Sequence, residues 1–210
     1  MKKVTVLLLV LIALLLGITG CKTDGFNKRE IVIIQSGDEE KIMPLTTINE
    51  KNDSLLLRQV ARKVKKRQIG SPLMELLRKR MLATVNDSLN PGVGIAAPQV
   101  GLSIRMIYVQ RLDKTGVPFE IYYNPEIKTY GDSAKTGREG CLSVPYYRGL
   151  VERSQNIFIS YLDSLGNERE EEIKNFTAVI FQHEIDHING MLYYDRINNG
   201  FESLTKTDDF

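Results

Sequence analysis

The sequence is poor in the residues that build disulfide frameworks and nucleic-acid sites. Its 210 residues include no tryptophan, two cysteines and two histidines. Two cysteines are too few for the disulfide framework of a small secreted domain. The formal net charge of +2 is too small to indicate a nucleic-acid partner, and we expect none. With 42% hydrophobic and 26% charged residues, the composition predicts one globular domain with a sizeable core.

The two histidines lie four residues apart, in the run Gln182-His183-Glu184-Ile185-Asp186-His187. Residues with this spacing share one face of an α-helix, so both imidazoles can bind a single ion while Glu184 reaches the attacking water. Apolar residues flank the motif, and Gly190 offers a left-handed stop. We therefore expect a central, buried helix with a hydrolytic metal site. The alternative is a pair of ordinary core histidines with a capping acid.

A hydrolytic metal site usually has three protein ligands, so a third ligand is needed. No histidine follows His187, and the only later glutamate is Glu202, so the downstream sequence is a poor source. Cys141, in the run from Glu139 to Val144, is the sole cysteine outside the N-terminal segment. A thiolate is a strong ligand for a soft or borderline ion. Cys141 is therefore the preferred ligand, and a small buried core residue is the alternative interpretation.

The first twenty residues are typical of an export signal. Two lysines precede an apolar run from Val4 to Leu16, which is shorter than the roughly 20 residues that span a bilayer. The following Ile18-Thr19-Gly20-Cys21 resembles the bacterial lipoprotein cleavage box, which implies that Cys21 carries lipid. We expect residues 1–20 to be a signal peptide and the protein to be extracytoplasmic and membrane-anchored through Cys21. A cytoplasmic protein is the alternative.

The remaining chain divides into three parts. Residues 21–41 are polar apart from the run Ile31-Val32-Ile33-Ile34, so we expect a tether with one strand-like piece. The hydrolase domain is expected over residues 42–198, followed by a loose polar tail at 199–210. Two basic runs, at 63–67 and 78–80, are expected to be solvated, with contact to anionic lipid as the alternative.

Several local signals indicate secondary structure within the expected domain. A helix is predicted from Pro72 to about Asn86, because Ser71 and Pro72 are typical of a helix start and a Pro-Gly turn follows. Four β-rich runs look like two hairpins. They are 104–109 with 120–123, and 157–162 with 168–173. Strands ahead of one long buried helix predict an α+β fold in which antiparallel sheets wrap that helix.

Three ordered stretches of the chain resemble the signature motifs of the peptide deformylase family. They are Gly92-Val93-Gly94-Ile95-Ala96-Ala97-Pro98-Gln99, the run from Glu139 to Ser143, and the run from Gln182 to His187. The resemblance is continuous from about Met43 to Ile197 and departs from the motifs only at Ile95, where leucine is commoner.

This resemblance implies a metal-dependent hydrolase that removes the formyl group from the N-terminal methionine of peptides and releases formate. Cys141, His183 and His187 would hold one divalent ion, typically Fe²⁺, with Ni²⁺, Co²⁺ or Zn²⁺ also possible. Glu184 would act as the general base, with the Gln99 amide and the Leu142 backbone N–H at the developing oxyanion. Further candidates for contacts to the peptide substrate are Val93, Gly94, Gly140 and, more weakly, Arg148.

Export conflicts with the cytosolic substrates that are usual for this family, so three hypotheses stay open. The first is an exported deformylase for formylated peptides. The second is an amidase for another small N-acyl peptide or amide, and the third is a non-catalytic peptide-binding lipoprotein. Glu184 and Gln99 count against the third, because a binding protein needs neither. We expect a monomer.

Overall fold

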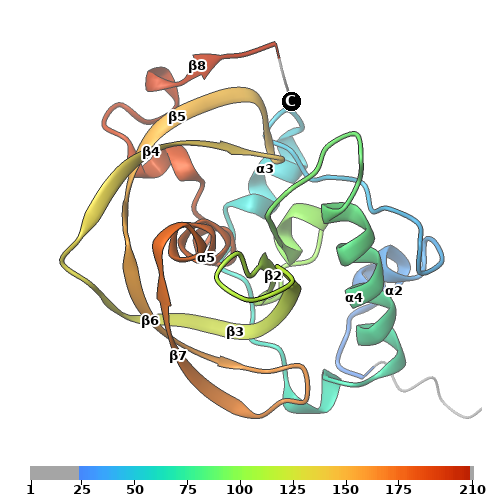
Figure 1. The fold of residues 1–210 in the computed structure, drawn as a ribbon. Helices are drawn as coiled ribbons and strands as arrows, with labels where there is room; N and C mark the ends of the chain where they lie inside the picture. The colour runs from blue at the N-terminus through green and yellow to red at the C-terminus, as the bar shows by residue number, and fades with distance from the viewer. Residues whose placement is uncertain (1–23, 209–210) are drawn as a thin grey trace, which may run out of the picture.

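The computed structural model describes residues 24–208, and two antiparallel sheets curve around one central helix (Figure 1). The five-stranded sheet has the order β1-β2-β3-β6-β7. Its strands are β1 (Gly94–Ala96), β2 (Met106–Gln110), β3 (Phe119–Tyr130), β6 (Asn156–Leu162) and β7 (Glu168–Lys174). The three-stranded sheet has the order β4-β5-β8, with β4 (Ala134–Cys141), β5 (Val144–Ser154) and β8 (Thr205–Lys206). The predicted α+β class is therefore confirmed.

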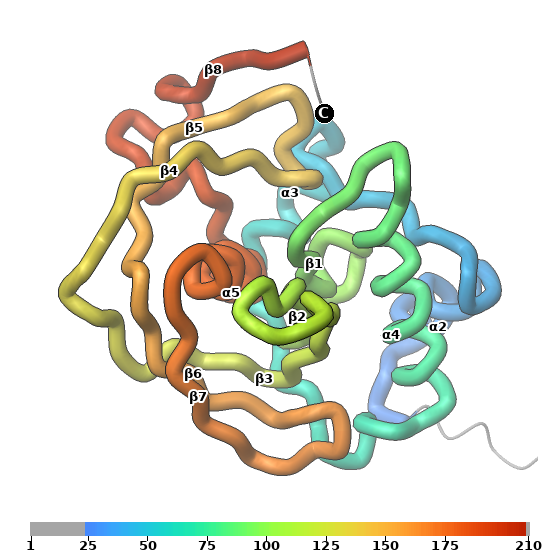
Figure 2. Tube along the Cα trace, viewed as in Figure 1, coloured from blue at the N-terminus to red at the C-terminus, as the bar shows by residue number. Residues whose placement is uncertain are grey.

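The central helix is α5 (Asn175–Ile188), which carries both histidines. It is buried on most sides because apolar residues occur around its whole circumference, including the fully buried Phe181 and Ile188. Figure 2 shows β1 passing beside α5 and β2. The helix stops at Gly190, which has φ 75°, and an added Cβ there would lie 2.6 Å from the Arg58 carbonyl oxygen. Only glycine fits this turn without backbone movement.

A second helix, α4 (Pro72–Val85), covers the outer side of β1 and was predicted to within one residue. Ser71 caps it by accepting a hydrogen bond from the Met74 N–H (3.3 Å). The basic run 78–80 was expected to be solvated, but its Arg80 is fully buried. Its guanidinium donates to the carbonyl oxygens of Ile33 and Ile34 at 2.9 Å each, and so joins α4 to the N-terminal segment.

The described part of the expected tether is folded onto the domain, so that prediction was wrong. Residues 28–34 form α2 (Lys28–Ile34), a helix rather than a strand. Asn27 and Glu30 form a reciprocal capping box, which starts a helix despite the β-branched run that follows. Phe26 and Ile34 are buried in the core, and α2 packs against α4.

The tail is also more ordered than predicted. The 3₁₀ turn η4 (Gly200–Ser203) leads into β8, whose two residues pair with Tyr147 and Arg148 of β5. Backbone pairing of this kind needs no apolar side chain, so a polar sequence does not reveal it.

The sheets agree with both predicted hairpins, since β2 pairs with β3 and β6 pairs with β7. The long β4–β5 hairpin was not predicted, because the residues of β4 are mostly exposed and lack apolar alternation. The shorter elements are α3 (Lys51–Leu57), η1 (Lys66–Gln68), η2 (Ala97–Val100) and η3 (Tyr193–Arg196). Within residues 24–208, every helix is too short or too polar to span a bilayer.

Candidate metal centre and active site

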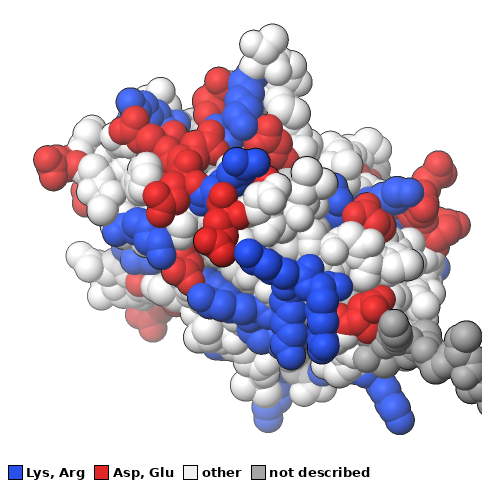
Figure 3. Space-filling model, turned by 90° about the horizontal axis from the view of Figure 1, so that it is seen from below, with Lys and Arg blue, Asp and Glu red and all other residues white. Residues whose placement is uncertain are grey.

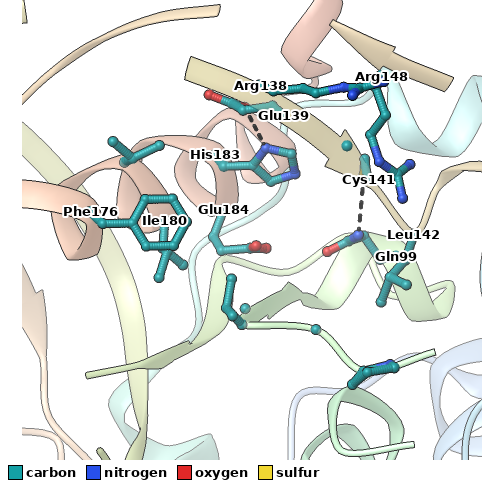
Figure 4. A pocket seen from close by; sticks show the side chains of 16 residues that line it. Gln99, Arg138, Glu139, Cys141, Leu142, Arg148, Phe176, Ile180, His183 and Glu184 are labelled. Atoms are coloured by element: carbon teal, nitrogen blue, oxygen red, sulfur yellow. Dashed lines mark hydrogen bonds and ion pairs between the residues drawn. The ribbon is translucent and has the colours of Figure 1, made fainter. Parts of the chain in front are cut away.

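The outer strands of the two sheets, β1 and β4, lie on opposite sides of a pocket of about 290 Å³. The start of α5 closes its third side, as Figure 4 shows. Both strands have one edge without a partner strand in the described chain, so an extended peptide could pair with either edge. The lining includes nine residues predicted for the site: Val93, Gly94, Gln99, Gly140, Cys141, Leu142, Arg148, His183 and Glu184.

The three predicted metal ligands converge beside this pocket. One potential ligand atom from each of Cys141, His183 and His187 lies within 4.8 Å of the others, and Cys141 Sγ is 3.2 Å from His187 Nε2. Tetrahedral coordination at ordinary bond lengths places ligand atoms about 3.5 Å apart. The α5 spacing brings the histidines together, and the β4–β5 turn brings in the cysteine. The donors and their spacing fit one divalent ion of the zinc or iron type.

A buried ion-pair network orients one of these histidines. Glu139 accepts a hydrogen bond from His183 Nδ1 (2.9 Å) and a bidentate pair from Arg153 (2.8 and 3.1 Å). Arg153 also donates to Asp186 (2.6 Å), which pairs in turn with Arg196 (2.6 Å). Burial alone would raise the pKa of Glu139, but the bonds from His183 and Arg153 outweigh it and hold the pKa at about 2. The carboxylate is therefore charged at neutral pH, and His183 Nε2 is left for the ion.

Glu184 projects from α5 into the pocket next to these ligands (Figure 4). It is 4% exposed, and its Oε2 has no hydrogen-bond partner among the described residues. An unpaired buried carboxylate is costly, so such a group points to a catalytic use. Burial raises the pKa of Glu184 to about 7, a range suited to a group that both takes and returns a proton.

The Gln99 amide is held with its NH₂ group toward the ligands. Its Oε1 accepts from the Ala96 N–H at 2.8 Å, which leaves Nε2 pointing at Cys141 Sγ, 3.6 Å away (Figure 4). Leu142 lines the pocket directly after Cys141. These two positions can supply N–H donors to one oxygen near the metal centre.

Two glycines let backbone approach the reacting groups. A Cβ on Gly94 would lie 2.6 Å from Glu184 Oε1, and a Cβ on Gly140 would lie 2.5 Å from the Arg148 side chain. Both distances are too short for any larger residue without movement of these side chains. The absence of a side chain at Gly94 therefore leaves room for the Glu184 carboxylate, and its absence at Gly140 lets the Arg148 side chain lie across β4.

Sequence reasoning named all three ligands and assigned no role to the residues that support them. Glu139 belongs to the second motif, but its partner Arg153, and the Asp186 that Arg153 also contacts, are distant from it in sequence. The apolar side of the pocket is formed by Phe176, Val179 and Ile180, and their apolar sequence pattern indicates only that the helix is buried. The predicted lipid site, Cys21, lies outside the described residues.

Comparisons with known proteins agree with this geometry. A sequence model of the polypeptide deformylase family matches residues 42–202. A peptide deformylase of Mesorhizobium japonicum is 39% identical over 145 residues, covering 68% of this chain and 79% of the relative. One from Streptococcus pyogenes is 38% identical over 165 residues, covering 65% and 81%.

Solved structures give the same result. A class I type b peptide deformylase of Acinetobacter baumannii, with Met-Ala-Ser bound, superposes with a TM-score of 0.66 at 35% identity. The match covers 75% of this chain and 99% of that one. The Thermotoga maritima peptide deformylase gives 0.65 at 33% identity, again covering 75% and 99%. On its sequence, its fold and its metal-site residues, this chain belongs to the peptide deformylase family.

Proposed function

We propose that this protein removes the N-formyl group from peptides that begin with formylmethionine and releases formate. The observation that carries this assignment is the unpaired, buried carboxylate of Glu184 beside the Cys141-His183-His187 ligand set. Relatives named peptide deformylase, one of them with a Met-Ala-Ser peptide bound, support it. An amidase for a different small N-acyl group is the competing function, because the same hydrolytic groups would serve it.

Cys141, His183 and His187 would hold a divalent ion, which would supply an acidified water and a Lewis acid for the substrate carbonyl. Glu184 would accept the proton of the attacking water and deliver it to the departing amine. The Gln99 Nε2–H and the Leu142 N–H donate to the oxyanion as it forms, so they stabilise the transition state more than the substrate.

The pocket walls suit a methionine at the start of an extended peptide. Phe176, Val179 and Ile180 form an apolar side next to Glu184, which can take up an unbranched thioether side chain. The free edges of β1 and β4 can pair with the peptide backbone. Val93, Gly94 and Gly140 lie along these edges at the pocket, which supports their proposed role in substrate binding.

We infer further that the enzyme acts outside the cytoplasm as a lipoprotein anchored through Cys21. The apolar run 4–16 and the Ile-Thr-Gly-Cys sequence support this inference. Stable attachment needs at least two acyl chains, which a lipid-modified N-terminal cysteine would provide. Fe²⁺ is the typical ion of the family, but export favours an ion that does not oxidise, such as Zn²⁺ or Ni²⁺.

The surface where the described chain begins is consistent with membrane attachment. Gly25 lies against Arg67, since a Cβ on this glycine would lie 3.5 Å from the guanidinium Nη2. Arg67 and its neighbours Lys65 and Lys66 are exposed, as are Lys28 and Arg29 at the start of α2. Figure 3 shows Lys and Arg side chains gathered on one face of the molecule. Basic side chains near an anionic headgroup layer contribute about 1 kcal/mol each to binding, so they would favour docking next to the anchor.

Two experiments test these proposals. Purified protein loaded with Fe²⁺, Ni²⁺ or Zn²⁺ is assayed for amine release from formyl-Met and acetyl-Met peptides, in wild type and in Glu184→Gln. Deformylation predicts formyl-specific turnover that falls at least ~100-fold in the variant, with metal content unchanged. Turnover of the acetyl peptide alone would favour the competing amidase.

The lipid anchor is tested by membrane fractionation and intact-mass analysis of wild type and Cys21→Ala. The variant is expected to lose membrane attachment, because all acyl chains depend on one thiol. A wild-type mass that still includes residues 1–20, or wild-type protein in the cytosol, would contradict the lipoprotein proposal.

A further inference from the structure

The charged side chains that line the pocket are divided between its two ends. The two carboxylates, Glu139 and Glu184, lie with His183 at the metal end, where Glu139 is paired with Arg153. The two arginines, Arg138 and Arg148, lie beyond Cys141, on the side opposite Phe176 and Ile180 (Figure 4). The pocket lining therefore has an apolar side, a catalytic centre and a cationic side.

The register of the β4–β5 hairpin puts both arginines on one face of this ribbon. Gly140 is paired with Arg148, and Arg138 is paired with Leu150. Residues two apart on a strand share a face, as do directly paired residues, so Arg138 and Arg148 are diagonal neighbours. No carboxylate of residues 24–208 pairs with Arg138, which is exposed. Two like charges placed together at a pocket are a natural site for an anionic group.

Gly140 fixes the direction of one of these arginines. A Cβ at this position would lie 2.5 Å from Cδ, Nε and Cζ of Arg148, so the side chain lies flat across the glycine. Arg148 also donates to the Tyr147 carbonyl oxygen at 3.0 Å. These contacts direct the guanidinium along β4 toward Leu142 and the pocket (Figure 4), rather than straight out into solvent.

We propose that Arg138 and Arg148 make this enzyme prefer formyl-methionyl peptides that carry a carboxylate at the second or third residue, counting methionine as the first. The carboxylate can belong to an aspartate or glutamate side chain or to the free C-terminus of a short peptide. This inference rests on the proposed deformylation, and it names the class of peptide that the same site selects.

The spacing along β4 supports this placement. An extended chain advances about 3.3 Å per residue, and Arg138 is three residues from Cys141 along β4. A peptide that pairs with the free edge of β4 and presents its formyl group at the metal therefore reaches Arg138 about 10 Å later, near its third residue. Arg148, paired with Gly140, lies nearer to the metal end. Its long side chain covers the preceding position.

The expected preference is moderate, because both cations are partly exposed to solvent. Exposed ion pairs change equilibria by a small factor each, and two acting together predict a kcat/KM about threefold to tenfold higher for acidic than for neutral peptides. Since salt shortens the screening length from about 10 Å at 0.1 M to about 3 Å at 1 M, the preference should nearly vanish at high salt.

The test compares peptides that differ only in charge. The series formyl-Met-Ala-Glu-amide, formyl-Met-Ala-Gln-amide and formyl-Met-Ala-Lys-amide places the charge on a side chain. The pair formyl-Met-Ala and formyl-Met-Ala-amide places it on the C-terminus. We expect kcat/KM to fall in the order Glu, Gln, Lys in the first series, and the free acid to exceed the amide in the second.

Variants assign the effect to the arginines. Arg138→Gln is expected to reduce the Glu-to-Lys ratio of kcat/KM at least threefold, and Arg138→Glu to invert it. Lys135→Gln is the matched control. It removes the same charge from the same exposed strand, but Lys135 alternates to the other face of β4 and does not line this pocket. The ratio should be unchanged in this variant.

Calorimetric titration of the metal-loaded protein with the deformylated peptides completes the design. The acidic product should bind threefold to tenfold more tightly than the lysine product, and Arg138→Gln should remove this difference. Equal affinities and equal kcat/KM values across the charge series would overturn the selectivity, as would the same loss in Lys135→Gln. Failure to turn over any formyl peptide would overturn deformylation instead, while the titration would still decide the role of the arginines.

Discussion

Replacement of Glu139 by glutamine tests a residue that supports the metal site, and it leaves the three metal ligands themselves unchanged. Glu139 is 9% exposed and accepts bonds from His183 Nδ1 (2.9 Å) and from Arg153 (2.8 and 3.1 Å). Glutamine keeps the size but removes the charge, so Arg153 is left with Asp186 as its remaining buried anion. His183 keeps at most a neutral amide oxygen in place of the carboxylate that sets its orientation and its basicity as a ligand.

The structure allows both effects to be given a magnitude. Loss of a carboxylate that supports a metal-bound histidine typically lowers metal affinity 10- to 100-fold. Breaking a buried ion pair costs about 3–5 kcal/mol, and we expect the lower end, about 3 kcal/mol, because Asp186 still compensates Arg153. For a domain of this size that corresponds to a decrease in Tm on the order of 10 °C.

The two quantities are measured separately. Metal affinity is obtained by competition with a chelator of known affinity, and Tm by calorimetry on the metal-free protein, so that ion binding does not contribute to stability. Glu152→Gln serves as the control, because Glu152 is an exposed glutamate next to Arg153 on β5 without an ion pair in the described chain. A folded Glu139→Gln protein with wild-type metal affinity would refute the argument that Glu139 positions His183.

Three further predictions follow from individual contacts. Cys141→Ser should reduce metal content much more than Tm, because a hydroxyl is nearly the size of a thiol but a far poorer ligand; unchanged metal affinity would place the third ligand elsewhere. Gly94→Ala should retain the ion and lower kcat about 100-fold, because its Cβ would lie 2.6 Å from Glu184 Oε1 and displace the base by about 1 Å; wild-type kcat would contradict this. The Arg111 hydrogen bond lowers the pKa of Asp113 from 3.8 to about 2, so its stabilisation is present above about pH 4 and is lost as pH falls toward 2. Asp113→Asn should therefore lower the free energy of unfolding by about 1 kcal/mol at pH 7 and by nearly nothing at pH 2, as urea titrations at both pH values would show.

The predictable parts of the fold are those in which neighbouring residues determine the outcome. The α5 helix follows from its apolar sequence, and its end follows from Gly190. The β2–β3 and β6–β7 hairpins follow from short β-rich runs with turns between them. The Asn27 capping box of α2 was also local, but the β-branched run after it predicted a strand. Packing of Ile34 and Phe26 into the core then favoured the helix.

The β4–β5 hairpin could not be predicted in the same way, and most of the unpredicted chemistry depends on it. Its strands contribute Glu139 and Arg153 to the network behind His183, and Arg138 and Arg148 to the pocket. In the sequence, none of these four charged residues differs from its neighbours in a way that predicts burial or a place in the site. Which of them are buried together is decided by strand register, because a shift of one residue would exchange the two faces of the ribbon.

The position of Cys141 in the metal site depends both on residue identity, which the sequence gives, and on strand register, which it does not. Cysteine and histidine are so scarce in the sequence that Cys141 could be predicted as the third ligand. Its position, in contrast, depends on the bulge between Gly140 and Cys141 at the end of β4. That irregularity pairs Cys141 with Val144, and the thiol meets His187 at 3.2 Å. Residue identity therefore supplies the metal ligands, and the register of one unpredicted hairpin places both the residues that support those ligands and the two arginines that line the pocket.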